Sequence, residues 1–139
     1  MEKILNSIKK RPLNIILMFV SVSLYFVNNL IIKKNTDGPI YIFFVSYFND
    51  LLCPYFFLSY ANLLFITSQK EMTKIGILLP VCMAAGCVWE FFAPYMKKGS
   101  ITDVGDLVCY FVSTIGYWAL LQKVIAKEKN RYGRSKEYL

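Results

Sequence analysis

Long uncharged and mostly apolar segments alternate along the chain with short segments that hold nearly all of its charged residues. Pro12 to Ile32 gives 21 consecutive residues without a charge, and Leu51 to Gln69 gives 19. Ile75 to Met96 is a 22-residue apolar segment interrupted by Glu90, and Leu107 to Gln122 adds 16 uncharged residues. A bilayer core of about 30 Å requires about 20 helical residues. The pattern therefore predicts four transmembrane helices, at about 12–32, 51–69, 75–96 and 101–122.

Two segments leave alternatives. Gly38 to Asn49 is apolar but too short to cross. It either lies along the interface or lengthens a tilted second helix from about residue 39, with a bend near Pro54. The first apolar segment follows a basic head, as in a signal peptide, but it is longer than such peptides and has no small-residue cleavage site. We therefore expect a retained helix and an all-α fold, in which residues 1–139 form a single membrane domain with short loops.

Composition agrees with a membrane protein, and the placement of charge indicates its orientation. Apolar residues make up 56% of the 139 residues, against about 45–50% in soluble domains. With the N-terminus inside, 12 of the 16 Lys and Arg residues lie on the cytoplasmic side, and the outer side holds Lys33, Lys34, Lys97 and Lys98. Positive loops stay inside, so both termini are predicted to be cytoplasmic, in a bacterial cytoplasmic membrane.

The net charge of +7 is then explained by topology and by contact with anionic membrane lipids. Nucleic acid is not needed as a partner. The acidic residues are more informative. Four of the nine lie among cytoplasmic basic residues, and Asp37 belongs to the turn sequence NTDGP. The other four fall toward the outer half of the membrane: Asp50, Glu90, Asp103 and Asp106.

A carboxylate at membrane depth is expensive, by ~2.5–3.5 kcal/mol at a helix centre, so it normally faces the protein interior or a wet cavity. An acid at the start of a helix can instead bind free backbone N–H groups. Asp103 closes the Ser-x-x-acid spacing that begins at Ser100, and Asp50 follows Asn49 at the start of the second crossing. Capping and ligand binding both stay open for these two residues.

Glu90 lies inside its helix beside Trp89 and Phe91, so it cannot be an N-cap. It is expected to be protonated, hydrogen-bonded across the bundle or paired with a cation. The fourth helix carries a polar stripe at intervals of 3, 4, 3 and 4, which places all its members on one inward face: Asp103, Asp106, Tyr110, Ser113 and Tyr117. We expect this face to point toward Glu90.

Two further patterns concern helix packing. Tyr55, Ser59 and Asn62 share one face of the second crossing, where they line a cavity or bond across helices. The third crossing has small residues that allow backbones to approach closely: Gly76, Ala84, Ala85 and Gly86.

Several kinds of chemistry have no residues to carry them. The chain has no histidine, which removes the commonest general base and metal ligand. Cys53, Cys82, Cys87 and Cys109 have no Cys-x-x-Cys spacing and are expected to pack as small apolar groups. We expect no enzyme activity and no cofactor. Two roles stay open for a Glu90 and Asp106 pair, which could act as acid and base or hold a divalent ion.

The segment WEFFAPYMKKGSITDVGDLVCYFVSTIGYW, residues 89–118, resembles the central region of the VanZ-like family of small membrane proteins, which is related to teicoplanin resistance. Glu90 matches an acidic residue near the outer end of one helix, and Pro94 with Lys97 or Lys98 matches the turn. Asp103 and Asp106 match the aspartates that open the next helix. The resemblance implies a role in envelope or glycopeptide tolerance, without a catalytic mechanism.

Three functions are compatible with these observations. In the first, an outward-facing acidic pocket binds a cationic or hydrogen-bonding envelope ligand, with Asp50, Glu90, Asp103, Asp106 and Tyr110 as its candidate residues. In the second, the protein is a small and oligomeric secondary transporter whose carboxylates Glu90 and Asp106 carry a proton or cation. In the third, it is an accessory subunit that binds a partner membrane protein.

Overall fold

The computed structural model describes residues 12–67, 70–96 and 104–137, and all of the regular structure within these ranges is helical. The all-α prediction is therefore confirmed for the described residues. The elements in chain order are α2 (Pro12–Val27), the π-helix η1 (Asn28–Ile32), α3 (Lys33–Asn35), α4 (Pro39–Ser46), α5 (Phe48–Thr67), α6 (Ile75–Met96) and α7 (Val104–Glu137).

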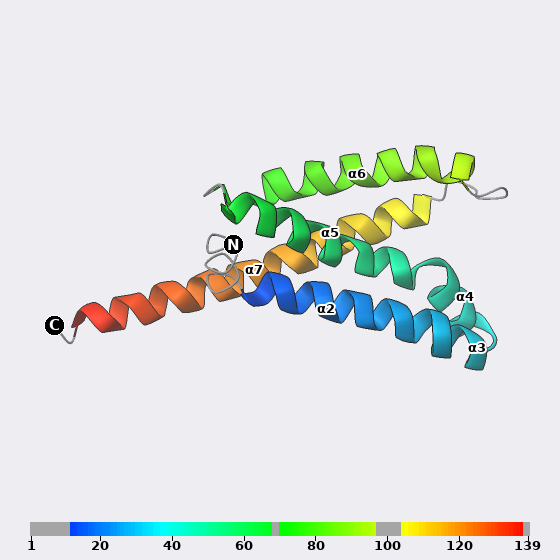
Figure 1. Cartoon of the computed structure of the whole chain (residues 1–139), viewed down its shortest axis with the longest axis horizontal. Helices are drawn as coiled ribbons and strands as arrows, with labels where there is room; N and C mark the ends of the chain where they lie inside the picture. Colours follow the sequence, from blue (N-terminus) through cyan, green and yellow to red (C-terminus); the bar gives the residue numbers. More distant parts are fainter. Residues whose placement is uncertain (1–11, 68–69, 97–103, 138–139) are drawn as a thin grey trace.

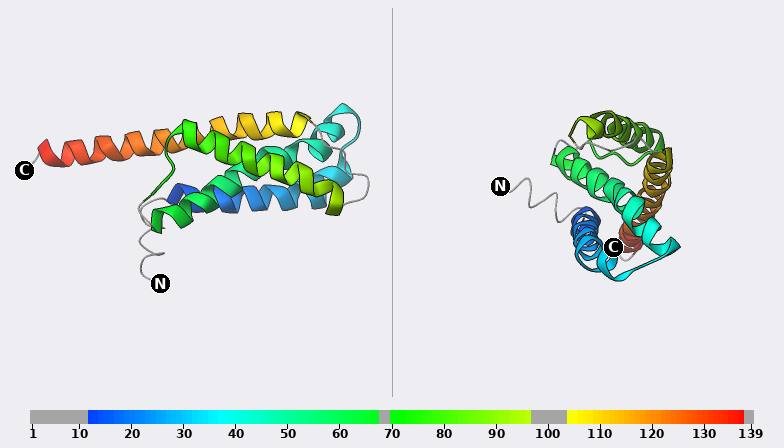
Figure 2. Two further views of the ribbon diagram at one scale, coloured as in Figure 1. Left: turned by 90° about the horizontal axis from the view of Figure 1, so that it is seen from above. Right: turned by 90° about the vertical axis from the view of Figure 1, so that its right-hand side faces the viewer.

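The long helices run alternately up and down along one axis, so that the start of α2 and the end of α7 lie at the same end of the bundle (Figures 1 and 2). We call this the Asn62 end, because α5 finishes there, and the opposite end the Asp50 end. Helix α5 packs against α2 on one side and α7 on the other, and α6 packs mainly against α7. The C-terminal part of α7 extends beyond the other helices.

The first and last helices are longer than the sequence pattern predicts. Helix α2 continues through the π turn to Asn35, and α7 continues past Gln122 to Glu137. The uncharged run ends at Lys123, but the following residues are largely good helix formers with no proline, so the backbone stays helical after the apolar surface ends. In α7 the helix is therefore longer than the apolar segment from which its length is predicted.

Residues 39–67 form two helices with a change of direction at Tyr47, where α4 meets α5 (Figure 1). The hydrogen bonds continue through this joint, since the Tyr47 N–H donates to the Phe43 carbonyl at 2.9 Å and the Leu51 N–H donates to the Tyr47 carbonyl at 3.0 Å. Pro54 lies buried inside α5 and is not the site of the break. The segment before residue 49 is thus a separate helix, α4, which is joined to the second long helix, α5, at an angle.

Within the part of the chain that the structure describes, three stretches of helix are long and apolar enough to cross a membrane: Pro12–Asn35, Pro39–Ile66 and Val104–Asn130. The part of α6 from Ile75 to Glu90 is a shorter apolar helix. The structure is therefore compatible with a multi-pass membrane protein.

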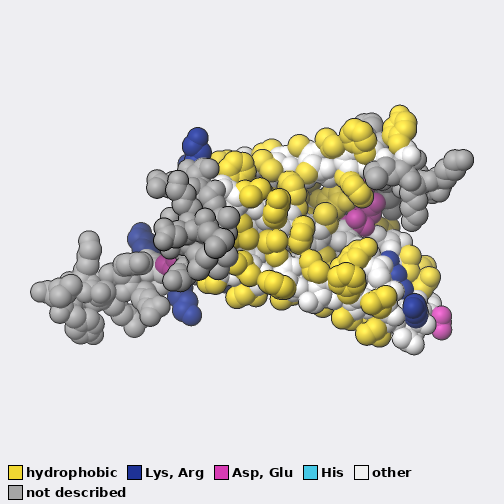
Figure 3. All heavy atoms as spheres, viewed as in Figure 1, with side chains coloured by type: hydrophobic (Ala, Val, Ile, Leu, Met, Phe, Trp, Pro, Cys, Tyr) yellow, Lys and Arg dark blue, Asp and Glu magenta, His cyan; other side chains and the backbone are white. Residues whose placement is uncertain are grey.

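Polar and apolar residues are distributed inside out relative to a soluble protein. Asn14, Asn28 and Asn62 are fully buried, whereas Phe19 is 71% exposed and Leu30 is 59% exposed. Hydrophobic side chains cover most of the visible face between the two ends (Figure 3). A soluble monomer rarely exposes so large a contiguous apolar surface. A protein surrounded by lipid exposes such a surface, because its polar groups must find hydrogen-bond partners inside the protein.

A buried hydrogen-bond network holds three helices together near the Asn62 end. The Tyr117 hydroxyl donates to Oδ1 of Asn14 at 2.8 Å and accepts from Nδ2 of Asn62, also at 2.8 Å. The Asn62 amide also bonds the backbone of Met72, with its Oδ1 accepting from the Met72 N–H at 2.8 Å and its Nδ2 donating to the Met72 carbonyl at 3.1 Å. Tyr117 thus links α2, α5 and α7, and Asn62 fixes the connection that leads into α6.

Tyr117→Phe is expected to lower the thermal midpoint of the detergent-solubilised protein, because it leaves the buried amides of Asn14 and Asn62 without their shared partner. Loss of such a bond costs about 1–3 kcal/mol when a buried group is left unsatisfied. Tyr60→Phe is the matched control, since it removes the same atom from a side chain that is 48% exposed. Equal midpoints for the two variants would contradict a stabilising role for the network.

Candidate functional site

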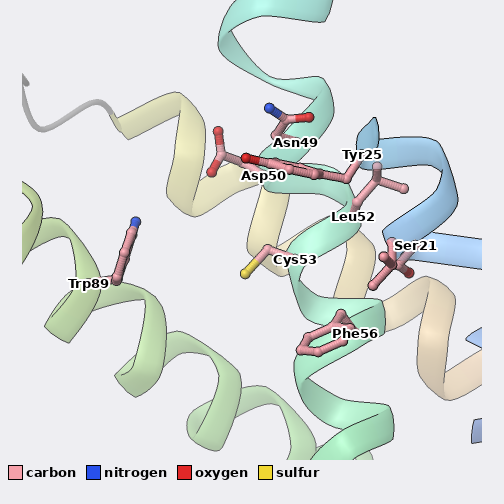
Figure 4. A pocket seen from close by; sticks show the side chains of 9 residues that line it. Ser21, Tyr25, Asn49, Asp50, Leu52, Cys53, Phe56 and Trp89 are labelled. Atoms are coloured by element: carbon pink, nitrogen blue, oxygen red, sulfur yellow. The ribbon is translucent and has the colours of Figure 1, made fainter. Parts of the chain in front are cut away.

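An open groove lies at the Asp50 end, between α5 and its neighbours α2 and α6. It has a volume of about 380 Å³ and is lined by Ser21, Val22, Tyr25, Asn49, Asp50, Leu52, Cys53, Phe56 and Trp89. In Figure 4, Asp50 and Cys53 project from α5 toward the space beside α6, which carries Trp89, while Ser21 and Tyr25 come from α2. Its walls are mostly apolar and aromatic, and Asp50 is the acid among these lining residues.

A second groove of about 240 Å³ continues from the first toward α7 and shares Cys53 and Trp89 with it. Its lining also includes Gly86 and Tyr110. The two grooves together follow α5 along the side that α6 leaves uncovered, because α6 packs mainly against α7. Acidic side chains are visible in the hollow between the upper and lower helices near this end (Figure 3).

Tyr110 of α7 joins the acidic residues of α5 and α6. Its hydroxyl donates to Oδ1 of Asp50 at 3.2 Å, and its ring packs against Gly86, which lies one turn before Glu90 on the same face of α6. Glu90 is 7% exposed and Tyr110 is 3% exposed. Asp106 lies one turn before Tyr110 on the same face of α7 and is half-buried. The site therefore draws on three helices.

Gly86 allows the Tyr110 ring to reach this position. A Cβ atom placed on Gly86 would lie 2.5 Å from Cδ2 of Tyr110, which is too close for a side chain. The expectation that small residues bring helices together is correct at Gly86. It is wrong at Gly76, where an added Cβ would meet nothing within 4 Å, and Ala84 is exposed.

Hydrogen bonds of asparagine side chains connect the α2 side of the groove to α4 and α5. Nδ2 of Asn28 donates to Oδ1 of Asn49 and to the Phe44 carbonyl, both at 2.9 Å. Asn28 opens the π turn η1, and π turns inside helices are frequent at functional sites. The Asn49 side chain is therefore used to hold α2 against α5, and Asp50 beside it lies in the first turn of α5.

The sequence-predicted candidates have different outcomes. Asp50, Glu90 and Tyr110 lie together, and Asp106 lies one turn away on the expected face. Asp103 lies outside the described residues. Transport by a Glu90 and Asp106 pair stays a prediction. Of the cysteines expected to pack as small apolar groups, Cys82 is buried in the core and Cys109 is half-buried, whereas Cys53 and Cys87 are exposed.

Sequence reasoning missed the polar positions of α2. Asn14, Ser21 and Asn28 are all buried, and they recur every seven residues, which is two helical turns. In a span with no charge, this spacing is the signal that marks the inward face. Its interval is longer than the intervals of 3 and 4 in the polar stripes of the second and fourth crossings, so the pattern is sparser.

The arrangement offers a carboxylate and a phenol beside aromatic walls. Among the described residues, no three Cys, Asp or Glu side chains gather as a metal site would require. Comparisons with protein-family models, with curated proteins and with solved structures each find no match to this chain.

Gly86→Ala is expected to lower the thermal midpoint, because the added methyl group forces the Tyr110 ring, and with it the bond to Asp50, to move. Overpacking of this kind costs about 1–3 kcal/mol. Gly76→Ala introduces the same methyl group on the same helix in open space, so its midpoint should match or exceed that of the wild type. A Gly86→Ala midpoint no lower than that of Gly76→Ala would refute the close approach.

Proposed function

We propose that the chain is a protein of the bacterial cytoplasmic membrane with four spanning helices and both termini in the cytoplasm. The crossing proposed in addition to the three longer apolar stretches is α6, which is the third in chain order and runs alongside them. The orientation is supported by the meeting of α2 and α7 at one end, together with the 12 basic residues that would lie on that side. The Asp50 end then faces outward.

Within this topology, the proposed function is to bind a cationic amphiphile at the outer face of the membrane. The observation that carries the proposal is Asp50 in a mostly apolar groove that is open beside α6. A volume of about 380 Å³ lies within the range of small-molecule sites, roughly 300–1,000 Å³. A carboxylate in such a groove favours a positive charge, and the apolar walls favour a hydrocarbon tail.

The aromatic residues strengthen the preference for a cation. Tyr25, Phe56 and Trp89 line the same groove as Asp50, and aromatic faces attract ammonium groups by about 0.5–2 kcal/mol. The hydroxyl of Tyr110 donates a hydrogen bond to the Asp50 carboxylate and so fixes its position. A tail that enters from the lipid would lie along the apolar walls while the head group stays near Asp50.

Membership of the VanZ-like family and a role in envelope or glycopeptide tolerance form the physiological part of the proposal. The support is the sequence resemblance of residues 89–118, together with a groove suited to capturing a membrane-active cationic molecule. Tolerance would then depend on the same carboxylate as amphiphile binding.

Dodecyltrimethylammonium is expected to bind the purified protein in neutral maltoside micelles, and Asp50→Asn should weaken binding by at least about fivefold, because a charge-assisted contact contributes about 1 kcal/mol or more. Trp89 fluorescence reports binding when Trp118 is replaced by Phe.

Expression of the wild type in a sensitive bacterium should raise glycopeptide tolerance, and Asp50→Asn should lose that gain.

Asp37→Asn is the control, because it removes the same charge from an exposed turn at the same end of the bundle. It should leave both the affinity and the tolerance unchanged. If Asp50→Asn binds the probe as tightly as Asp37→Asn, the groove is not a cation site. Binding without any gain in tolerance would refute only the physiological part.

A further inference from the structure

A separate groove lies at the Asn62 end, between the start of α6 and the middle of α7. It has a volume of about 490 Å³ and is lined by residues 73–76 together with Trp118, Gln122 and Ile125. None of these residues lines the two grooves at the Asp50 end. In the proposed topology this groove opens at the cytoplasmic leaflet.

Two features keep the groove in place and open. Nε2 of Gln122 donates to the Thr73 carbonyl at 2.7 Å, which fixes α7 against the start of α6. Gly76 is exposed, and a Cβ atom added to it would meet nothing within 4 Å. The missing side chain at Gly76 therefore leaves space beside the apolar groups of Ile75, Trp118 and Ile125.

The mouth of the groove is basic. Lys74 lines it and is exposed. On α7, positions 118, 122, 125 and 129 follow intervals of 4, 3 and 4, so Lys129 lies on the same face one turn beyond Ile125. Residues 70–74 and 123–129, which flank this end, contain five lysines (70, 74, 123, 127 and 129) and two acids, Glu71 and Glu128.

We propose that this groove binds an anionic phospholipid, with an acyl chain against the apolar wall and the phosphate near Lys74 and Lys129. Charge complementarity favours this occupant, because the cytoplasmic leaflet carries anionic lipid and each nearby basic residue contributes about 1 kcal/mol of attraction. Trp118, half-buried beside the mouth, is a residue type enriched at the membrane interface. The proposal rests on the membrane topology proposed above but not on the cation site.

The test measures the thermal midpoint of the purified protein in maltoside micelles as phosphatidylglycerol or phosphatidylcholine with the same acyl chains is added. Phosphatidylglycerol should raise the midpoint more than phosphatidylcholine. Lys74→Gln should increase the half-saturating concentration of phosphatidylglycerol about fivefold, in line with the loss of one basic contact. Gly76→Leu, which fills the groove, should abolish the preference for phosphatidylglycerol.

Two controls match these variants. Lys34→Gln removes an exposed lysine at the opposite end, and Ala84→Leu enlarges an exposed small residue on the same helix as Gly76. Both should keep the wild-type preference, as should Asp50→Asn, which separates this site from the cation site. The proposal is overturned if the two lipids stabilise the wild type equally, or if Lys74→Gln and Gly76→Leu respond to phosphatidylglycerol as their controls do.

Discussion

The structure depends on the requirement that polar groups within a hydrocarbon phase find their partners inside the protein. Tyr117 shows how the sequence meets it at Oδ1 of Asn14 and at Asn62, while Nδ2 of Asn14 has no hydrogen-bond partner among the described residues. Its hydroxyl lies between the buried amides of Asn14 and Asn62, and so connects three helices through one oxygen atom. Because lipid covers apolar surface as well as another helix does, apolar contact alone gives these helices little reason to associate in one register. The amides supply that register.

The same requirement shapes the Asp50 end. The bond from Tyr110 to Asp50 joins α7 to α5, and the small surface of Gly86 lets the tyrosine ring pass against α6. The candidate site is therefore supported by helix packing, not by a loop. This helps to explain how an acid can be kept in an apolar groove, since its neighbour on α7 is held by the fold itself.

The positions of the long helices could be predicted from uncharged runs, and the inward stripe of α7 could be predicted from its spacing. The residue that this stripe contacts on the neighbouring helix could not be predicted. Periodicity showed that Tyr110 faces inward, but contact with Asp50 follows from the order in which the helices pack, with α5 between α2 and α7. That order is not encoded in the period of any one helix.

Other misses have equally specific causes. The break at Tyr47 has neither a proline nor a glycine to mark it, and the extension of α7 past Gln122 follows from helix propensity where hydropathy ends. Asn14 and Asn28 recur with Ser21 at seven-residue intervals, a sparser pattern than the intervals of 4 and 3 that mark a polar face on the second crossing. A sequence rule that follows amides and hydroxyls over two helical turns would find them.

The central claim is that the Asp50 end faces outward while the Asn62 end faces the cytoplasm. It is tested most directly by labelling single cysteines, introduced into a variant without the four native ones, with a membrane-impermeant maleimide in intact cells. Asp37→Cys, in the turn between α3 and α4, should label in intact cells, and Lys70→Cys, in the connection before α6, only after the membrane is permeabilised. The reverse pattern, or labelling of both in intact cells, would contradict the account.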